Sequence, residues 1–148
     1  MIDINHLSGT YSFPNGIFGF EDIKEFGISG IASIDGDVIG LVSKDYIFIC
    51  IDPLLINPNF KIEISDEAKK FLKNTDEKDL SVICIVAIAT DHGVSSNLAA
   101  PIVLDTKSKI GFQYVMKQKW ENIKYKFDTS KIKGLQELID FKITKRKT

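Results

Sequence analysis

Short segments rich in β-branched and aromatic residues, separated by connections of hairpin length, constrain this chain more than any other feature of its sequence. We count seven to nine such segments. Parallel strands need crossover connections of about a dozen residues or more, and most of the connections here are shorter. The pattern therefore predicts a mainly β protein, an antiparallel β-barrel-like domain or sandwich with short peripheral helices.

Two of these segments are apolar without interruption, namely Tyr46–Ile51 and Ser81–Thr90. A strand with no polar face is typical of a sheet position that is covered on both sides. Each run contains one of the two cysteines, Cys50 and Cys84, and a buried cysteine behaves as a small apolar side chain. We therefore expect two inert core thiols and no disulfide framework.

Turn residues and alternating polarity predict the other strands. Asp35-Gly36 is a strong hairpin signal between Ile28–Ile34 and Val38–Ser43. Residues 106–109 form a second turn, between Leu98–Asp105 and Ile110–Met116. Further short strands are predicted within Asn5–Ser12, where a loop leads into the strand, and over Phe60–Ile64 and Ile123–Phe127.

Three segments suggest short helices. Phe20, Ile23 and Phe26 are spaced by three, which favours one or two helical turns. Ser65 is a suitable N-cap because Asp66 and Glu67 would follow it in the first turn. Near the end of the chain, one side of a helix within Lys131–Phe141 would be apolar, formed by Ile132, Leu135, Leu138 and Ile139.

The charge is divided unevenly along the chain. Residues 1–116 hold nine lysines against sixteen carboxylates, a net charge of −7, whereas residues 117–148 hold ten basic and four acidic residues, a net charge of +6. We expect a β-barrel-like domain over residues 1–127 and a basic C-terminal extension over residues 128–148, whose apolar spacing favours a helix. Arg146 is the one arginine beside eighteen lysines, which lowers the expectation of sequence-specific nucleic-acid binding.

Residues suited to catalysis or metal binding are few. His6 and His92 are far apart in the sequence and neither has a cysteine or histidine within a helical turn of it. Asp91, His92 and Ser96 share one loop, but adjacent residues rarely achieve the geometry of a catalytic triad. A hydrolase built around His92 is therefore a minor hypothesis, and we expect a protein that is not an enzyme and needs no cofactor.

No segment is suited to targeting or membrane insertion. The longest apolar run, Val82–Ala89, is much shorter than the roughly 20 residues that cross a bilayer. The first residues lack the basic and apolar regions of a signal peptide. These observations predict a cytoplasmic protein that does not bind membranes.

Two stretches of this sequence resemble the signatures of one family. Phe13-Pro14-Asn15-Gly16-Ile17-Phe18-Gly19-Phe20-Glu21 resembles F-P-x-G-[LI]-x-G-F-E, and residues 96–105, SNLAAPIVLD, followed by Gly111 and Gln113, resemble T-x-N-L-x-A-P-I-V-I-N…G-x-Q. Asp52-Pro53 resembles a D-P step between them. Together these motifs resemble the flagellar assembly factor FliW family, although Ser96 and Asp105 stand where the family usually has threonine and asparagine.

The resemblance implies a β-barrel-like protein without enzymatic activity that binds flagellin in the cytoplasm. It also implies binding to CsrA, an RNA-binding translational regulator, away from the RNA site, so that flagellin translation is coupled to export. An acidic body with almost no arginine suits a basic protein partner better than RNA. A nucleic-acid-binding β-barrel that uses the basic tail, around Lys142–Lys147, is the alternative.

The same motifs supply the candidate partner-binding residues. Three of them are the aromatic residues of the first motif, for which core packing is the competing interpretation. In the second motif, Asn97 caps a turn and Pro101 marks an edge strand, or else this segment forms a partner surface, and the sequence leaves both interpretations open. The full set is Phe13, Phe18, Phe20, Ser96, Asn97, Leu98 and Pro101.

Overall fold

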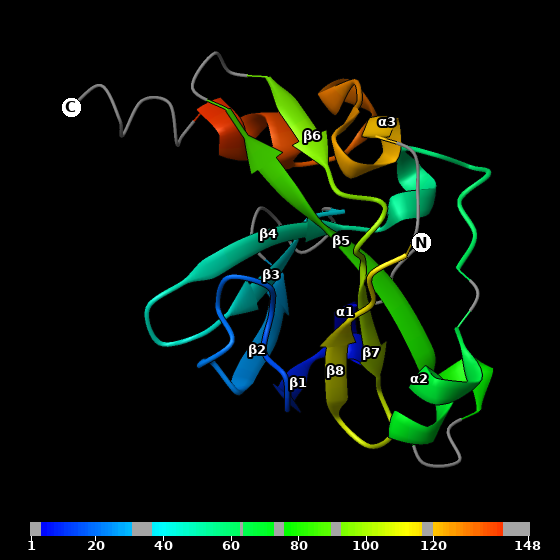
Figure 1. Ribbon diagram of the computed structural model, residues 1–148. Coiled ribbons are helices and arrows are strands. Elements are labelled where there is room, and N and C mark those ends of the chain that lie inside the picture. Colours follow the sequence, from blue (N-terminus) through cyan, green and yellow to red (C-terminus); the bar gives the residue numbers. More distant parts are fainter. Residues whose placement is uncertain are drawn as a thin grey trace.

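The fold is mainly β in the computed structural model, which describes residues 4–30, 37–62, 64–72, 76–89, 93–116 and 120–140 (Figure 1). Nine strands belong to a single sheet. They are β1 (Gly9–Ser12), β2 (Glu25–Gly30), β3 (Ile39–Val42), β4 (Ile47–Ile51), β5 (Leu80–Ile88), β6 (Val94–Ser96), β7 (Ile102–Asp105), β8 (Ile110–Gln113) and β9 (Tyr125–Lys126).

Seven strands close into a ring in the order β4-β3-β2-β1-β8-β7-β5. The ring closes where β4 pairs with β5, through Cys50 opposite Ile85 and Ile51 opposite Cys84. Every pairing is antiparallel except that of β1 with β8, a single parallel step between Ser12 and Ile110. The upper part of β5 carries β6 and then β9, so the predicted β-barrel-like fold is confirmed.

Side chains that point into the ring form one apolar core. Because side chains alternate along a strand, each ring strand contributes every second residue to this interior. Gly111 of β8 leaves room for the Phe13 ring, since a Cβ at Gly111 would lie 2.4 Å from the Phe13 Cζ. The largest side chains of this inner core are Tyr11, Phe13, Phe26, Leu7, Leu41, Ile83, Ile102 and Leu104.

The outer face of β4 and β5 is covered by the end of the chain. Ile51 and Cys84 pack in a second cluster with Ile132, Leu135 and Ile139. Ile132 follows the 3-10 helix η3 (Thr129–Lys131), and Leu135 and Ile139 lie on a helical stretch over residues 135–140, which confirms the helix expected there. Residues 128–140 therefore fold back onto the ring, whereas the basic segment 142–147 lies outside the described residues.

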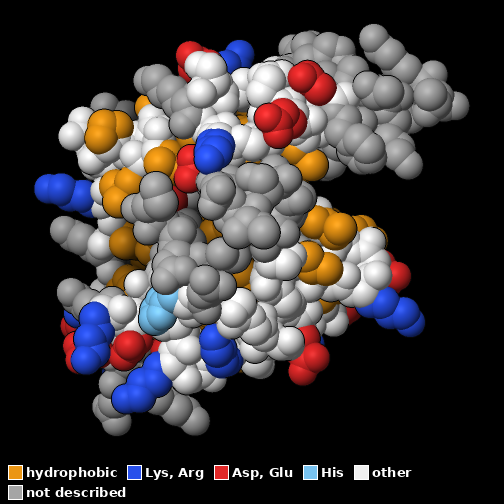
Figure 2. Space-filling view, turned by 180° about the vertical axis from the view of Figure 1, so that it is seen from behind, with side chains coloured by type: hydrophobic (Ala, Val, Ile, Leu, Met, Phe, Trp, Pro, Cys, Tyr) orange, Lys and Arg blue, Asp and Glu red, His pale blue; other side chains and the backbone are white. Residues whose placement is uncertain are grey.

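The apolar run Tyr46–Ile51, which contains β4, is covered over only part of its length. Phe48 and Cys50 face the inner core, and Ile49 and Ile51 pack in the outer cluster. Ile47, however, is 62% exposed and Tyr46 is also exposed. Hydrophobic side chains gather on the side of the molecule where β4 begins (Figure 2). The prediction of a fully covered strand is therefore wrong for its first two residues, because the C-terminal cover does not extend over them.

The described helices are short. Besides η3 and the 135–140 stretch, they are α1 (Ile4–Leu7), α2 (Asp66–Phe71), α3 (Trp120–Ile123) and the 3-10 turns η1 (Pro53–Leu55) and η2 (Glu77–Asp79). The predicted Ser65 cap of α2 is confirmed, since its Oγ accepts a hydrogen bond from the Ala68 amide at 3.2 Å. Leu72 at the end of α2 packs with Val103 and Phe112 on the outer face of β7 and β8. No helix in the described ranges is long and apolar enough to cross a membrane.

Three segments differ from their sequence-based predictions. Residues 20–26 form turns followed by the start of β2, because the Phe20 and Phe26 rings pack against strand side chains rather than along a helix. Residues 60–62 and 64 form no strand, although Phe60, Ile62 and Ile64 alternate with polar residues, because Phe60 packs in a different cluster from Ile62 and Ile64. Ile123 ends α3, so the last predicted strand is reduced to β9.

Candidate functional site

The first family motif places its three phenylalanines in three different environments. Phe13 is fully buried and meets Phe26 edge to face, with ring centroids 5.0 Å apart. Phe20 is partly buried between Tyr46 and Phe48, at centroid distances of 4.9 and 5.0 Å. Phe18, in contrast, is 84% exposed. The first two anchor the motif to the ring, and the third is available to a partner.

The exposure of Phe18 follows from a tight turn at residues 17–20. Ile17 and Phe20 form an isolated bridge, which turns the chain so that the intervening residues project outward. Gly16 has φ of +65° and a Cβ there would lie 2.6 Å from the Glu21 Cα, so only glycine fits this close approach. The backbone therefore holds Phe18 at the tip of a fixed loop.

The second motif is mostly internal structure. The Ser96 Oγ donates a hydrogen bond to the Ile85 carbonyl at 2.7 Å, and Leu98 and Pro101 are buried. The Asn97 Oδ1 accepts a hydrogen bond from the Ala99 amide at 3.0 Å, as expected for the capping interpretation. These contacts give the four predicted residues 96, 97, 98 and 101 structural roles, and a direct partner contact by them stays a prediction.

Gln113 joins the two motifs. Its Oε1 accepts a hydrogen bond from the Phe18 amide at 2.9 Å, and its Nε2 donates to the Ala100 carbonyl at 3.1 Å. The Oε1 and Nε2 atoms of Gln113 therefore both form hydrogen bonds, and the two segments that they bind are about 80 residues apart in the sequence. Gln113 of the second motif therefore ties the Phe18 loop of the first motif to the Ala100 backbone of the second.

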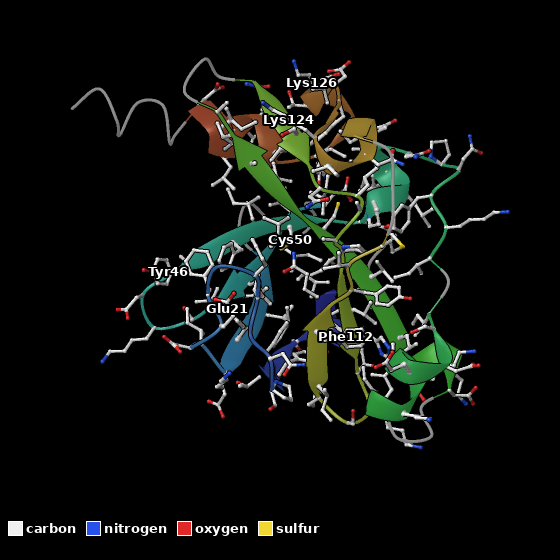
Figure 3. The ribbon with its side chains drawn as sticks, in the orientation of Figure 1. Glu21, Tyr46, Cys50, Phe112, Lys124 and Lys126 are labelled. Carbon is white, nitrogen blue, oxygen red and sulfur yellow. The ribbon has the colours of Figure 1, made fainter. Side chains whose placement is uncertain are left out.

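A cavity of about 460 Å³ opens beside this junction. It lies between the Phe18 loop, the first turn of α2 and the end of β8, with Phe112 on the side of the ring where α2 packs (Figure 3). Its size falls within the range of about 300–1,000 Å³ that is usual for ligand pockets. We call it the Phe18 pocket, and it is lined by Asn15, Gly16, Phe18, Glu21, Ser65, Glu67, Ala68, Phe112, Gln113, Tyr114 and Val115.

The charged residues that line the Phe18 pocket are both acidic, Glu21 and Glu67. The Gly19 amide donates to the Glu21 Oε1 at 3.0 Å, and this hydrogen bond is the main cause that lowers the pKa of the Glu21 carboxyl. Glu21 is therefore held as a carboxylate at neutral pH. The pocket combines an apolar wall with a negative rim.

The other candidates for chemistry offer little in the described residues. Burial raises the pKa of the Cys84 thiol to about 12 and that of Cys50 well above its usual value, so both thiols are protonated at neutral pH. His6 lies 3.4 Å from the Thr106 hydroxyl. No group of three or more metal-ligating side chains occurs in the described ranges, and Asp91 and His92 lie outside them.

Sequence reasoning identified only part of the pocket. It selects Phe18 and predicts a strand over Ile110–Met116, but it does not join them to Glu67 of α2. Glu67 was expected only as a residue of the first helical turn. The sequence feature that could have indicated the pocket is Gln113 of the second motif, because it is a polar residue in an otherwise apolar strand.

Comparison with known proteins identifies the relationship. The chain matches the profile of the FliW protein family over residues 2–127. It is 33% identical to the flagellar assembly factor FliW of Borrelia hermsii over 82% of this chain and 95% of that protein, and 32% identical to that of Caldicellulosiruptor bescii over 76% of each. A crystal structure of the flagellar assembly factor FliW superposes with a TM-score of 0.69 at 25% identity, covering 85% of this chain and 88% of the other. The chain therefore belongs to the flagellar assembly factor FliW family.

Proposed function

We propose that this protein is a cytoplasmic flagellar assembly factor that binds flagellin and also binds the RNA-binding regulator CsrA. Binding to CsrA antagonises it non-competitively, so that free flagellin, by occupying the factor, matches flagellin translation to export. The family match over residues 2–127 is the observation that carries this proposal. The relatives that share this match are named flagellar assembly factors.

The protein acts by binding rather than by catalysis. The Phe18 pocket offers an exposed aromatic side chain and an apolar wall, which are features of protein-recognition sites. The described part of the chain offers buried, protonated thiols and no cluster of metal ligands. A binding surface is therefore the feature that this geometry supports best.

The charge distribution favours a basic protein partner over a nucleic acid. Residues 1–116 carry a net charge of −7, from nine lysines and sixteen carboxylates, and contain no arginine. Opposite charges accelerate the encounter of two proteins, and salt screens this effect over about 10 Å at 0.1 M. We expect the association rate with CsrA to fall as salt rises from low to physiological concentration, and an unchanged rate would contradict this electrostatic contribution.

The direct test is calorimetric titration of the full-length protein with purified flagellin and with purified CsrA. We expect binding to both, and a pre-formed complex with flagellin should bind CsrA more weakly. A ternary mixture with CsrA and its target RNA then tests the non-competitive mode, in which raising the RNA concentration does not displace the factor. Binding to neither protein at micromolar concentration would overturn the proposal.

The alternative, RNA binding through the basic tail, requires a careful deletion. Removing everything after Phe127 would also remove Ile132, Leu135 and Ile139 from the outer cluster, so a loss of function would only report unfolding. Deletion of residues 141–148 leaves these side chains in place. The alternative predicts that this shorter deletion abolishes RNA retardation in a gel, whereas our proposal predicts unchanged binding to flagellin.

A further inference from the structure

The Phe18 pocket has a wall that suits a large apolar side chain. Phe112 and Tyr114 meet edge to face, with ring centroids 6.2 Å apart, and Ala68 and Val115 extend this surface. Phe18 and Val115 are 84% and 71% exposed, so each still has most of its apolar area available for burial. Burying such area against a partner is favourable by about 25 cal/mol per Å².

The rim of the pocket selects for positive charge. Glu21 and Glu67 line it, and no lining residue is basic. Among the described residues, the ion pair observed is Lys78 with Asp76, so neither Glu21 nor Glu67 belongs to one. Lys24 also lowers the pKa of Glu21 through its charge, but its ammonium donates to the Pro14 carbonyl at 3.1 Å and forms no ion pair with Glu21. A lysine or arginine beside the apolar anchor of a partner would therefore find two carboxylates without a salt bridge.

The chain after β8 offers an open backbone edge in the pocket. The Tyr114 amide donates to the Pro101 carbonyl at 2.9 Å and the Met116 amide to the Ala99 carbonyl at 2.7 Å, so this segment continues the antiparallel register of β7 and β8. Backbone N–H and C=O groups alternate in direction along an extended chain. The N–H and C=O groups of Val115 therefore point away from residues 99–101. Val115 forms no hydrogen bond with any described residue.

We propose that the Phe18 pocket binds an extended peptide segment of a protein partner, which inserts one large apolar side chain flanked by lysine or arginine. The apolar side chain lies between Phe18 and the Phe112–Val115 wall. The basic side chain pairs with Glu21 or Glu67, and the peptide backbone pairs with Val115 as an added strand. The inference rests on the proposed function only in its choice of flagellin and CsrA as probes.

Matched substitutions test the pocket in the full-length protein. Phe18→Ala removes the exposed anchor, and Leu54→Ala, which truncates another exposed side chain outside the pocket, is its control. Glu67→Gln removes one rim charge, and Glu137→Gln, on the exposed face of the 135–140 helix, is its control. Flagellin and CsrA are first titrated into the wild type, and each protein that binds is then titrated into all four variants.

We expect Phe18→Ala to weaken binding by about tenfold or more, as for an interface anchor. Glu67→Gln should weaken it by a smaller factor that shrinks at high salt, and both controls should bind as the wild type does. The Val115 amide signal should shift on binding in a ¹⁵N-edited spectrum. Wild-type affinity in both pocket variants would overturn the proposal.

A peptide selection tests this inference separately from the proposed function. A displayed library of random 12-residue peptides is selected on the wild type and counter-selected on Phe18→Ala. We expect enriched sequences with an aromatic or aliphatic residue within two positions of lysine or arginine. If flagellin and CsrA both fail to bind, the proposed function is wrong, and the peptide selection alone decides on the pocket. Peptides that are not basic, or that bind Phe18→Ala equally well, would overturn it.

Discussion

The two family motifs meet at Gln113 but use their side chains in opposite ways. The first motif buries Phe13 and presents Phe18 to solvent at the tip of a fixed turn. The second motif buries Leu98, directs the Ser96 hydroxyl to the Ile85 carbonyl of β5, and uses the Asn97 side chain to accept a hydrogen bond from its own Ala99 amide. Motif membership therefore does not distinguish a contact residue from a supporting one, and local geometry decides between them.

Among the substitutions that test this comparison of the two motifs, Leu98→Ala should cause the largest loss of stability. Leu98 is buried in the outer cluster, and truncating such a side chain leaves a cavity, so the free energy of unfolding should fall by about 2–5 kcal/mol. Urea denaturation followed by circular dichroism measures the loss. Leu54→Ala, at a 53% exposed position, should change it by less than about 0.5 kcal/mol. An equally small loss for Leu98→Ala would mean that the second motif is not structural.

Ser96→Ala should have an intermediate effect. It removes the 2.7 Å hydrogen bond to the Ile85 carbonyl in a buried part of the sheet, so unfolding should become easier by about 0.5–1.5 kcal/mol. Ser29→Ala on β2, where the side chain is exposed, provides the control in the same denaturation experiment. Loss of partner binding without any loss of stability would reverse our interpretation of Ser96.

Phe18→Ala should leave stability unchanged within about 0.5 kcal/mol. The side chain is mostly exposed, and the loop is held through the Phe18 backbone amide rather than through the ring. Thermal unfolding by calorimetry measures this directly. A drop as large as that of Leu98→Ala would mean that the aromatic side chain supports the loop, and the contrast between the two motifs would disappear.

The smallest effect concerns the pH dependence of Glu21. Because its pKa is lowered in the folded protein, Glu21 stabilises the fold above the ordinary glutamate pKa, and this contribution is lost as pH falls through the lowered value. The stability difference between wild type and Glu21→Gln should therefore be present at pH 6 and shrink as the pH falls through the lowered pKa. Denaturation curves at several pH values test this, and a difference that grows toward acid pH would contradict it.

The sequence predicted the ring better than the pocket. Hairpin turns and alternating strands are local signals, so the strands from β2 to β5 and the β7–β8 hairpin could be recognised from neighbouring residues. The cover over β4 could not, because Ile132, Leu135 and Ile139 lie some 80 residues away in the sequence. Phe20, Ile23 and Phe26 misled the prediction because the turn between them brings the Phe20 and Phe26 rings to the same residue, Phe48 of β4, without a helix.

The pocket was only partly predictable for the same reason. Exposure of Phe18 depends on the bridge between Ile17 and Phe20 and on the left-handed conformation of Gly16, and neither follows from residue types alone. Glu67 reaches the site through the docking of α2 onto β7 and β8. Such contacts between distant segments are set by packing, which a single sequence does not encode in a readable pattern.

The two cysteines lie on neighbouring strands but face opposite sides of the sheet. Cys50 belongs to the inner cluster and Cys84 to the outer one, so each apolar core contains its own thiol reporter. In mild denaturant, a pulse of a thiol-alkylating reagent followed by peptide mass mapping would record the opening of the two cores separately. If the C-terminal cover detaches before the ring opens, Cys84 becomes alkylated first, and the molecule reports the order of its own disassembly.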